Sequence, residues 1–169
     1  MSTGRSYIDA AYDAIFQNDF HKAIELFKQA IRCEPNNASY YYRLSITYDR
    51  SGFMKKAIET AKKASELEPE NQNYRYHLQI LQSKNLVLVA VDLMRRNIFT
   101  KETKGMLLQA KKLDPLNIDA YLLLGIFYGE TNALELSLKE FNSIFFIQPY
   151  HLQAKQLKDY YLNLYQEGD

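Results

Sequence analysis

The sequence is poor in cysteine, glycine and proline, lacks tryptophan, and carries almost no net charge. Its single cysteine, Cys33, excludes an internal disulfide, so nothing favours a secreted, disulfide-stabilised protein. A formal net charge of +1, from 21 basic and 20 acidic side chains, gives no electrostatic reason to expect nucleic acid or an anionic membrane as a partner. No segment approaches the roughly 20 apolar residues of a membrane helix, and the first residues lack the apolar core of a signal peptide. We therefore expect a cytoplasmic protein.

Sequence motifs for catalysis are also missing. The three histidines, His21, His77 and His151, are far apart in the chain, and none has metal-ligand spacing with another histidine or with Cys33. The chain contains no phosphate-binding loop, no GxSxG motif and no HExxH motif. We therefore expect a protein that is not an enzyme and that binds no metal or cofactor.

What the sequence does contain is a repeat marked by its prolines. The four prolines, Pro35, Pro69, Pro115 and Pro149, are separated by 34, 46 and 34 residues. Each proline follows a helical pattern and ends it, because proline cannot continue a helix and also restricts the preceding residue. A repeat in this range of lengths is typical of a solenoid built from stacked units.

Each unit has the pattern of two helices joined by a tight turn. Small side chains such as Ala57 and Ala61 recur in the segment before each proline, where two helices would approach closely. Asn18, Gly52 and Asn132 stand at the same distance before the proline of their units. Glycine and asparagine are the residues that accept a left-handed conformation at the end of a helix. The pattern therefore predicts helix, turn, helix and proline in each unit.

This pattern resembles the tetratricopeptide repeat family, whose units of about 34 residues have small side chains at fixed positions and a proline near the end. The resemblance implies an all-α fold, a right-handed superhelix of antiparallel helix pairs. It predicts a single domain over residues 1–169, with repeats at about 4–37, 38–71, 72–117 (extended) and 118–151. The stripe of apolar residues after Pro149 predicts a capping helix at about 152–166, which would cover the last apolar face.

The third repeat is irregular because its interval carries 12 extra residues, which include the most apolar run of the chain, Asn85–Met94. If Asn97 forms the turn and Thr100 caps the following helix, eleven residues are added to the first helix. Eleven residues are about three turns, so the helix would continue to about Arg96 with its faces preserved. The alternative is a break at Ser83–Asn85. The stripe predicted to pack inward is Leu86, Val89, Ala90 and Leu93.

The same run carries a second apolar stripe, Val87, Val91 and Met94. A helix that is apolar on most sides is normally buried on most sides. This stripe could face the fourth repeat, a bound peptide or a second copy of the chain. Homodimerisation through residues 86–94, with these three side chains at the interface, is therefore the alternative function.

The resemblance also implies a partner site, since proteins of this family bind peptides in the concave groove lined by the first helix of each repeat. Tyrosine suits such a groove because it offers a large contact area at low entropic cost. The competing interpretation is that a short array closes its own groove and that these side chains are core. The predicted groove residues are Ile8, Tyr12, Tyr42, Arg43, Ile46, Arg50, Tyr76, Ile80, Leu122 and Ile126.

One ligand of the family is not expected here. Family members that hold the acidic tail of heat-shock chaperones use lysine, asparagine and arginine side chains as a carboxylate clamp. The corresponding positions in this chain are Ile8, Tyr12, Arg43, Asn73 and His77, which do not supply the clamp. The function that the resemblance implies is thus non-catalytic protein–protein interaction, as an adaptor, assembly factor or chaperone-like scaffold.

Overall fold

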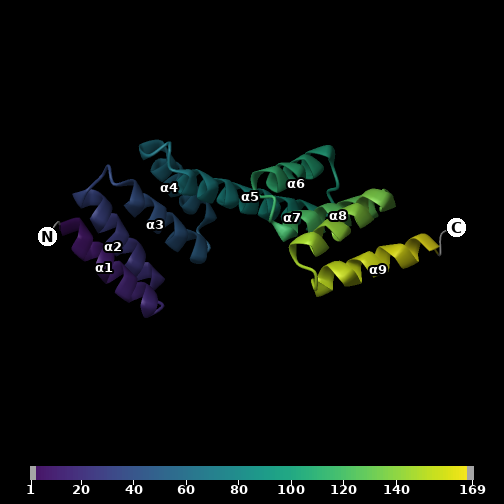
Figure 1. The fold of residues 1–169 in the computed structure, drawn as a ribbon, viewed down its shortest axis with the longest axis horizontal. Coiled ribbons are helices and arrows are strands. Elements are labelled where there is room, and N and C mark those ends of the chain that lie inside the picture. Colours follow the sequence, from purple (N-terminus) through teal and green to yellow (C-terminus); the bar gives the residue numbers. More distant parts are fainter. Residues whose placement is uncertain (1–2, 167–169) are drawn as a thin grey trace. The chain divides into compact units, whose positions relative to one another are not determined.

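A computed structural model describes residues 3–166, and the regular structure within that range is entirely helical (Figure 1). The predicted all-α fold is therefore confirmed, with helices paired in sequence order. In chain order the helices are α1 (Thr3–Phe16), α2 (Phe20–Cys33), α3 (Ala38–Arg50), α4 (Met54–Leu67), α5 (Gln72–Arg95), α6 (Lys101–Leu113), α7 (Ile118–Glu130), α8 (Leu134–Ile147) and α9 (Leu152–Gln166).

The predicted turns are confirmed residue by residue. Asn18, Asn97 and Asn132 have φ angles of 60°, 61° and 55°, and Gly52 has a φ of 77°. These are left-handed conformations, which asparagine and glycine adopt at lower cost than other residues. Each one therefore reverses the chain within a few residues, so that the two helices of a unit can lie side by side.

The described helices group into two compact units, one ending at Leu81 and the other beginning at Gln82. In the first unit, α1 packs on α2 and α3 on α4, around a core that includes Phe27, Leu44 and Leu81 (Figure 1). In the second unit, Leu107 and Phe141 are fully buried in separate core clusters. Both units are built from the same helix–turn–helix element.

Helix α5 is continuous, and the alternative of a break at Ser83–Asn85 is wrong. Ser83 is fully buried in the second unit. Its hydroxyl donates to the carbonyl oxygen of Ala110 at 2.8 Å and accepts a hydrogen bond from the Asn117 side-chain amide at 2.8 Å. These two hydrogen bonds hold Ser83 within the buried part of the helix, where a surface loop would not lie. The following helix begins as predicted, because Thr100 accepts a hydrogen bond from the Thr103 amide at 3.3 Å.

The face that α5 turns inward differs from the prediction at one position. Ala90 is fully buried and Leu86 packs against a core cluster, as expected, but Val89 is exposed. Val87 takes the buried place instead. Positions 87, 90 and 94 are spaced by three and four residues, so they share one helix face, and that face meets α6 and α7.

Helix α9 covers the last apolar face of the second unit, in the role of the predicted cap. The Tyr161 ring stacks on the Phe141 ring at a centroid distance of 6.0 Å, and its hydroxyl donates to the Glu130 carboxylate at 2.8 Å. Burial, together with the negative charge of Glu130, raises the pKa of Tyr161 far above the usual value for tyrosine. Tyr160 and Leu164, also on α9, are exposed.

No helix among the described residues is long and apolar enough to span a membrane.

Candidate functional site

Three of the predicted groove residues, Tyr12, Tyr42 and Arg43, lie on a surface formed by α1, α3 and the first part of α5. The guanidinium carbon of Arg43 lies 5.1 Å from the centre of the Tyr12 ring, which links α3 to α1. The Tyr42 ring lies 4.9 Å from the Tyr74 ring and 5.0 Å from the His77 ring, which links α3 to α5. We call this surface the aromatic groove. Cation–π and aromatic contacts of this kind hold the rings in fixed orientations.

A pocket of about 410 Å³ lies at the α1 side of the aromatic groove. Its base is apolar, because Ile8 and Tyr40 are buried, whereas Arg5 and Tyr12 at its rim are exposed. Three of the predicted residues therefore meet in one pocket. The lining residues are Arg5, Ile8, Asp9, Tyr12, Asn37, Ser39, Tyr40 and Arg43.

Hydrogen bonds stiffen the wall of this pocket. The Asn37 side-chain amide donates to the Glu34 carboxylate at 3.0 Å, and the Arg43 Nε donates to the Ser39 hydroxyl at 3.1 Å. Burial raises the pKa of Tyr40, and the negative charge of Glu34 raises it further, so the phenol stays protonated and hydrogen-bonded to that carboxylate. A wall whose side chains already have fixed partners loses little entropy when a ligand binds.

Tyr74 is the groove residue that the sequence prediction missed. It does not occupy one of the positions that the repeat pattern assigns to the groove, yet its ring packs on Tyr42. Burial is the main reason that its pKa is raised, with Glu68 adding to the effect. Nearby, the Ser45 hydroxyl and His77 Nε2 lie 2.8 Å apart in a hydrogen bond. The signal in the sequence was the cluster of aromatic side chains at the start of α5.

The other predicted residues of the first unit differ in accessibility. Tyr76, at 46% exposure, and Arg50 face solvent, whereas Ile46 and Ile80 are half-buried. Tyr42 is also half-buried because of its ring contacts. The predicted groove residues of the first unit that are exposed are therefore tyrosine and arginine side chains.

In the second unit the predicted groove residues lie in the core. Leu122 is buried and Ile126 packs against the same cluster, which includes Phe141 and Tyr161. Helix α9 contributes Tyr161 to this cluster, so the capping helix covers the side chains that the repeat pattern assigns to a groove. These two positions fit the competing interpretation, in which the array closes its own groove.

The stripe predicted for self-association also packs within the chain. Val87, at 6% exposure, and Val91 belong to a cluster with Ala110 and Ala120, and Met94 packs against Ala90 and its neighbours. Helices α6 and α7 of the same unit therefore occupy the face that was predicted for a second copy. The exposed apolar side chains of this run are instead Leu88 and Val89.

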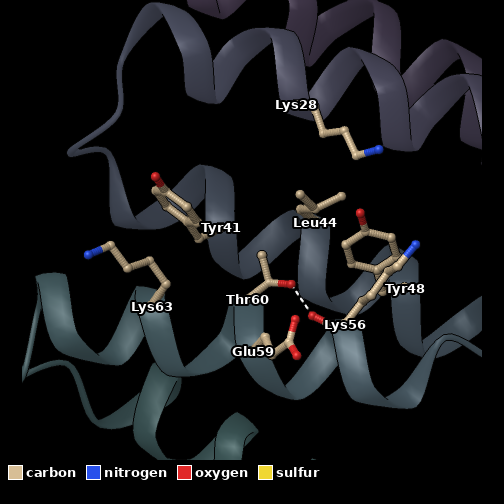
Figure 2. Close-up of a pocket in the computed structure, with 8 residues that line it drawn as sticks. All are labelled: Lys28, Tyr41, Leu44, Tyr48, Lys56, Glu59, Thr60 and Lys63. Atoms are coloured by element: carbon tan, nitrogen blue, oxygen red, sulfur yellow. Dashed lines mark hydrogen bonds between the residues drawn. The ribbon is translucent and has the colours of Figure 1, made fainter.

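A second depression, of about 470 Å³, lies between α2, α3 and α4 and was not predicted (Figure 2). We call it the lysine pocket. The sequence feature that indicates this pocket is a shared spacing: Tyr41 and Tyr48 on α3 are separated by the same number of residues as Lys56 and Lys63 on α4. The lining residues are Lys28, Tyr41, Leu44, Tyr48, Lys56, Glu59, Thr60 and Lys63.

Within residues 3–166 we find no group of three or more histidine, cysteine, aspartate or glutamate side chains arranged to hold a metal ion. The aromatic groove and the lysine pocket are the candidate sites.

Repeated antiparallel helix pairs with left-handed turns define a helical-repeat protein. Residues 26–59 match the tetratricopeptide repeat family, and the chain has the fold of tetratricopeptide repeat proteins. No protein of curated function matches the sequence.

Three solved structures of similar fold are distant from this chain in sequence. A MamA crystal structure is 22% identical over 98% of this chain and 89% of that chain, with a TM-score of 0.57. MamA from Desulfovibrio magneticus RS-1 is 18% identical over 97% of this chain and 85% of that chain, with a TM-score of 0.58. A tetratricopeptide repeat protein from Parabacteroides merdae ATCC 43184 is 16% identical over 97% of this chain and 62% of that chain, with a TM-score of 0.57. These similarities show the fold alone.

Proposed function

We propose that the chain is a non-catalytic protein-interaction module and that its first unit binds an extended segment of a partner protein in the aromatic groove. The observation that carries this proposal is the alignment of ring and guanidinium contacts across three helices, with Arg43 on Tyr12 and Tyr42 on Tyr74. Modules of this family are scaffolds that bind protein or peptide partners, and the roles of adaptor, assembly factor and chaperone-like protein all follow from such binding.

The composition of the groove indicates what the bound segment should look like. Exposed tyrosines provide flat apolar area together with a hydroxyl group that can hydrogen-bond a peptide backbone. Arg5 and Arg43 at the pocket rim outnumber the single carboxylate of the lining, Asp9. A segment with an apolar side chain for the pocket and an acidic side chain beside it would therefore complement the groove.

The proposal can be tested by selecting peptides from a displayed random library and comparing their affinity for variants. We expect Tyr76→Ala and Arg43→Ala each to weaken a selected peptide by about tenfold or more, because exposed tyrosine and arginine are the usual energetic anchors of an interface. Tyr76 is exposed, so its loss should change the free energy of unfolding by no more than about 0.5 kcal/mol. Affinity is measured by fluorescence anisotropy and stability by thermal unfolding.

Tyr150→Ala is the matched control for this experiment. Tyr150 is 95% exposed and belongs to the second unit, so the change removes the same side chain from another surface. We expect this variant to bind the selected peptide like the unmodified protein. Equal weakening by Tyr150→Ala and Tyr76→Ala would show that the peptide does not use the aromatic groove, and the proposal would fail.

A further inference from the structure

The lysine pocket lies on the side of α3 away from the aromatic groove. Tyr41, Leu44 and Tyr48 line the pocket, whereas Tyr42 and Arg43 belong to the groove. Because successive residues of a helix are rotated by about 100°, these two sets face roughly opposite directions. A ligand in the lysine pocket would therefore not compete with one in the aromatic groove.

Positive charge dominates the rim of the pocket. Three lysines line it together with one carboxylate, Glu59. Lys28 already forms an ion pair at 2.6 Å with Glu25, which does not line the pocket. Lys63, in contrast, makes no ion pair with any described residue, and Lys56 lies over the rings of Tyr48 and Phe53 at 5.8 Å and 5.2 Å. Cations held only by aromatic rings or by water remain available to an anionic partner.

The charges stand at two ends of an apolar floor. Figure 2 shows Lys28 and Lys56 beside Tyr48 at one end and Lys63 near Tyr41 at the other, with Leu44 between them. Leu44 is buried and forms part of the core cluster below. The pocket therefore offers cation, apolar surface and cation in a row, a pattern that a simple inorganic anion would use only in part.

The spacing of the two ends suits an extended peptide. Lys56 and Lys63 are seven residues apart on α4, which corresponds to about 10.5 Å along the helix. In an extended chain, residues i, i+2 and i+4 face the same way, and the outer two lie about 13 Å apart. The flexible lysine side chains can bridge the difference between the separation along α4 and the separation of the outer peptide positions. Acidic side chains at the outer positions and an apolar side chain at the central one would match the row.

We propose that the lysine pocket is a second interaction site, which binds an extended segment of a partner protein with the pattern acidic–x–apolar–x–acidic. The outer carboxylates pair with Lys63 and with Lys56, and the central apolar side chain packs on Leu44 and the flanking tyrosine rings. The inference does not depend on the aromatic groove, since it rests on other residues of α2, α3 and α4.

The test uses a defined probe, the fluorescein-labelled peptide Gly-Glu-Ser-Leu-Ser-Glu-Gly, titrated with the full chain at low salt. We expect binding, with backbone chemical-shift changes in α2, α3 and α4. Lys63→Glu should weaken it by about tenfold or more, since the variant replaces an attraction by a repulsion. The peptide with both glutamates changed to glutamine should bind weakly or not at all, and so should the peptide with serine in place of leucine.

Lys55→Glu is the matched control, because Lys55 lies on the same helix, is exposed and does not line the pocket. It changes the net charge by the same amount, and we expect at most about a twofold effect. Equal weakening by Lys55→Glu would indicate non-specific attraction and overturn the proposal. So would absence of binding, shift changes confined to α1, α3 and α5, or equal displacement of the peptide by inorganic phosphate at the same concentration.

Tyr76→Ala separates this inference from the proposed function. Tyr76 is a predicted residue of the aromatic groove and does not line the lysine pocket, so its replacement should leave binding of the glutamate peptide unchanged. Loss of binding in Tyr76→Ala would place the peptide in the groove and refute the second site, whereas loss in Lys63→Glu alone would support it even if the groove bound nothing.

Discussion

Val87→Glu should destabilise the second unit by about 3–5 kcal/mol, because it places a carboxylate without a partner in the core. Val87 is 6% exposed and packs with Ala110, Ala120 and Leu123. The neighbours of Val87 in this cluster are apolar, so the new charge would gain no hydrogen bond from their side chains. Urea unfolding followed by circular dichroism measures the loss, and hydrogen exchange should locate the first loss of protection in α6 and α7.

The result also decides the question of self-association. Leu88→Glu is the matched control, because the neighbouring side chain is 55% exposed and the added charge is the same. We expect it to change the free energy of unfolding by no more than about 0.5 kcal/mol. If Val87→Glu instead left stability intact and only converted a dimer to a monomer in light scattering, the packing described here would be wrong and the homodimer interpretation would stand.

Gly125→Ala is expected to destabilise the protein by about 1–3 kcal/mol, although alanine is the better helix former. A Cβ atom at position 125 would lie 2.4 Å from the Phe141 ring. That ring is fully buried against Tyr161 and Ile144, so it cannot move aside without disturbing the core. Position 125 thus needs glycine because α7 and α8 approach closely there. Differential scanning calorimetry would show the lowered melting temperature.

Replacement of another helical glycine by alanine should change the stability in the opposite direction. Gly105 also lies inside a helix, α6, but a Cβ atom there would meet nothing within 4 Å. We expect Gly105→Ala to stabilise the protein by about 0.5–1 kcal/mol, since alanine loses less conformational entropy than glycine on folding. If both variants were stabilised, the close approach of Phe141 to α7 would be refuted.

The sequence was sufficient to predict the helices and turns because those features depend on neighbours in the chain. The four prolines marked the ends of α2, α4, α6 and α8, and residues 18, 52, 97 and 132 formed the predicted left-handed turns. The continuation of α5 through the apolar run followed from a similarly local argument, since about three added turns preserve the helix faces. Local chemistry and the length of the repeat therefore determined the architecture of each unit.

The candidate site was predicted only in part. Arg43 lies over the Tyr12 ring and Tyr42 packs on Tyr74, whereas Leu122 and Ile126 are in the core. The repeat pattern assigns the same positions to the groove in every unit. It cannot indicate that α9 follows the last repeat closely enough to cover them.

What the sequence by itself determined about this protein is the series of paired helices, their turns and the resemblance to a repeat family. Tertiary structure alone decided which of the two apolar stripes on α5 is buried, since Val87 and Val89 are equally apolar and only the positions of α6 and α7 distinguish them. It also decided that Lys28, Lys56 and Lys63 share one pocket. Helix boundaries arise from interactions within a few residues, whereas burial and pockets depend on surfaces contributed by several helices at once.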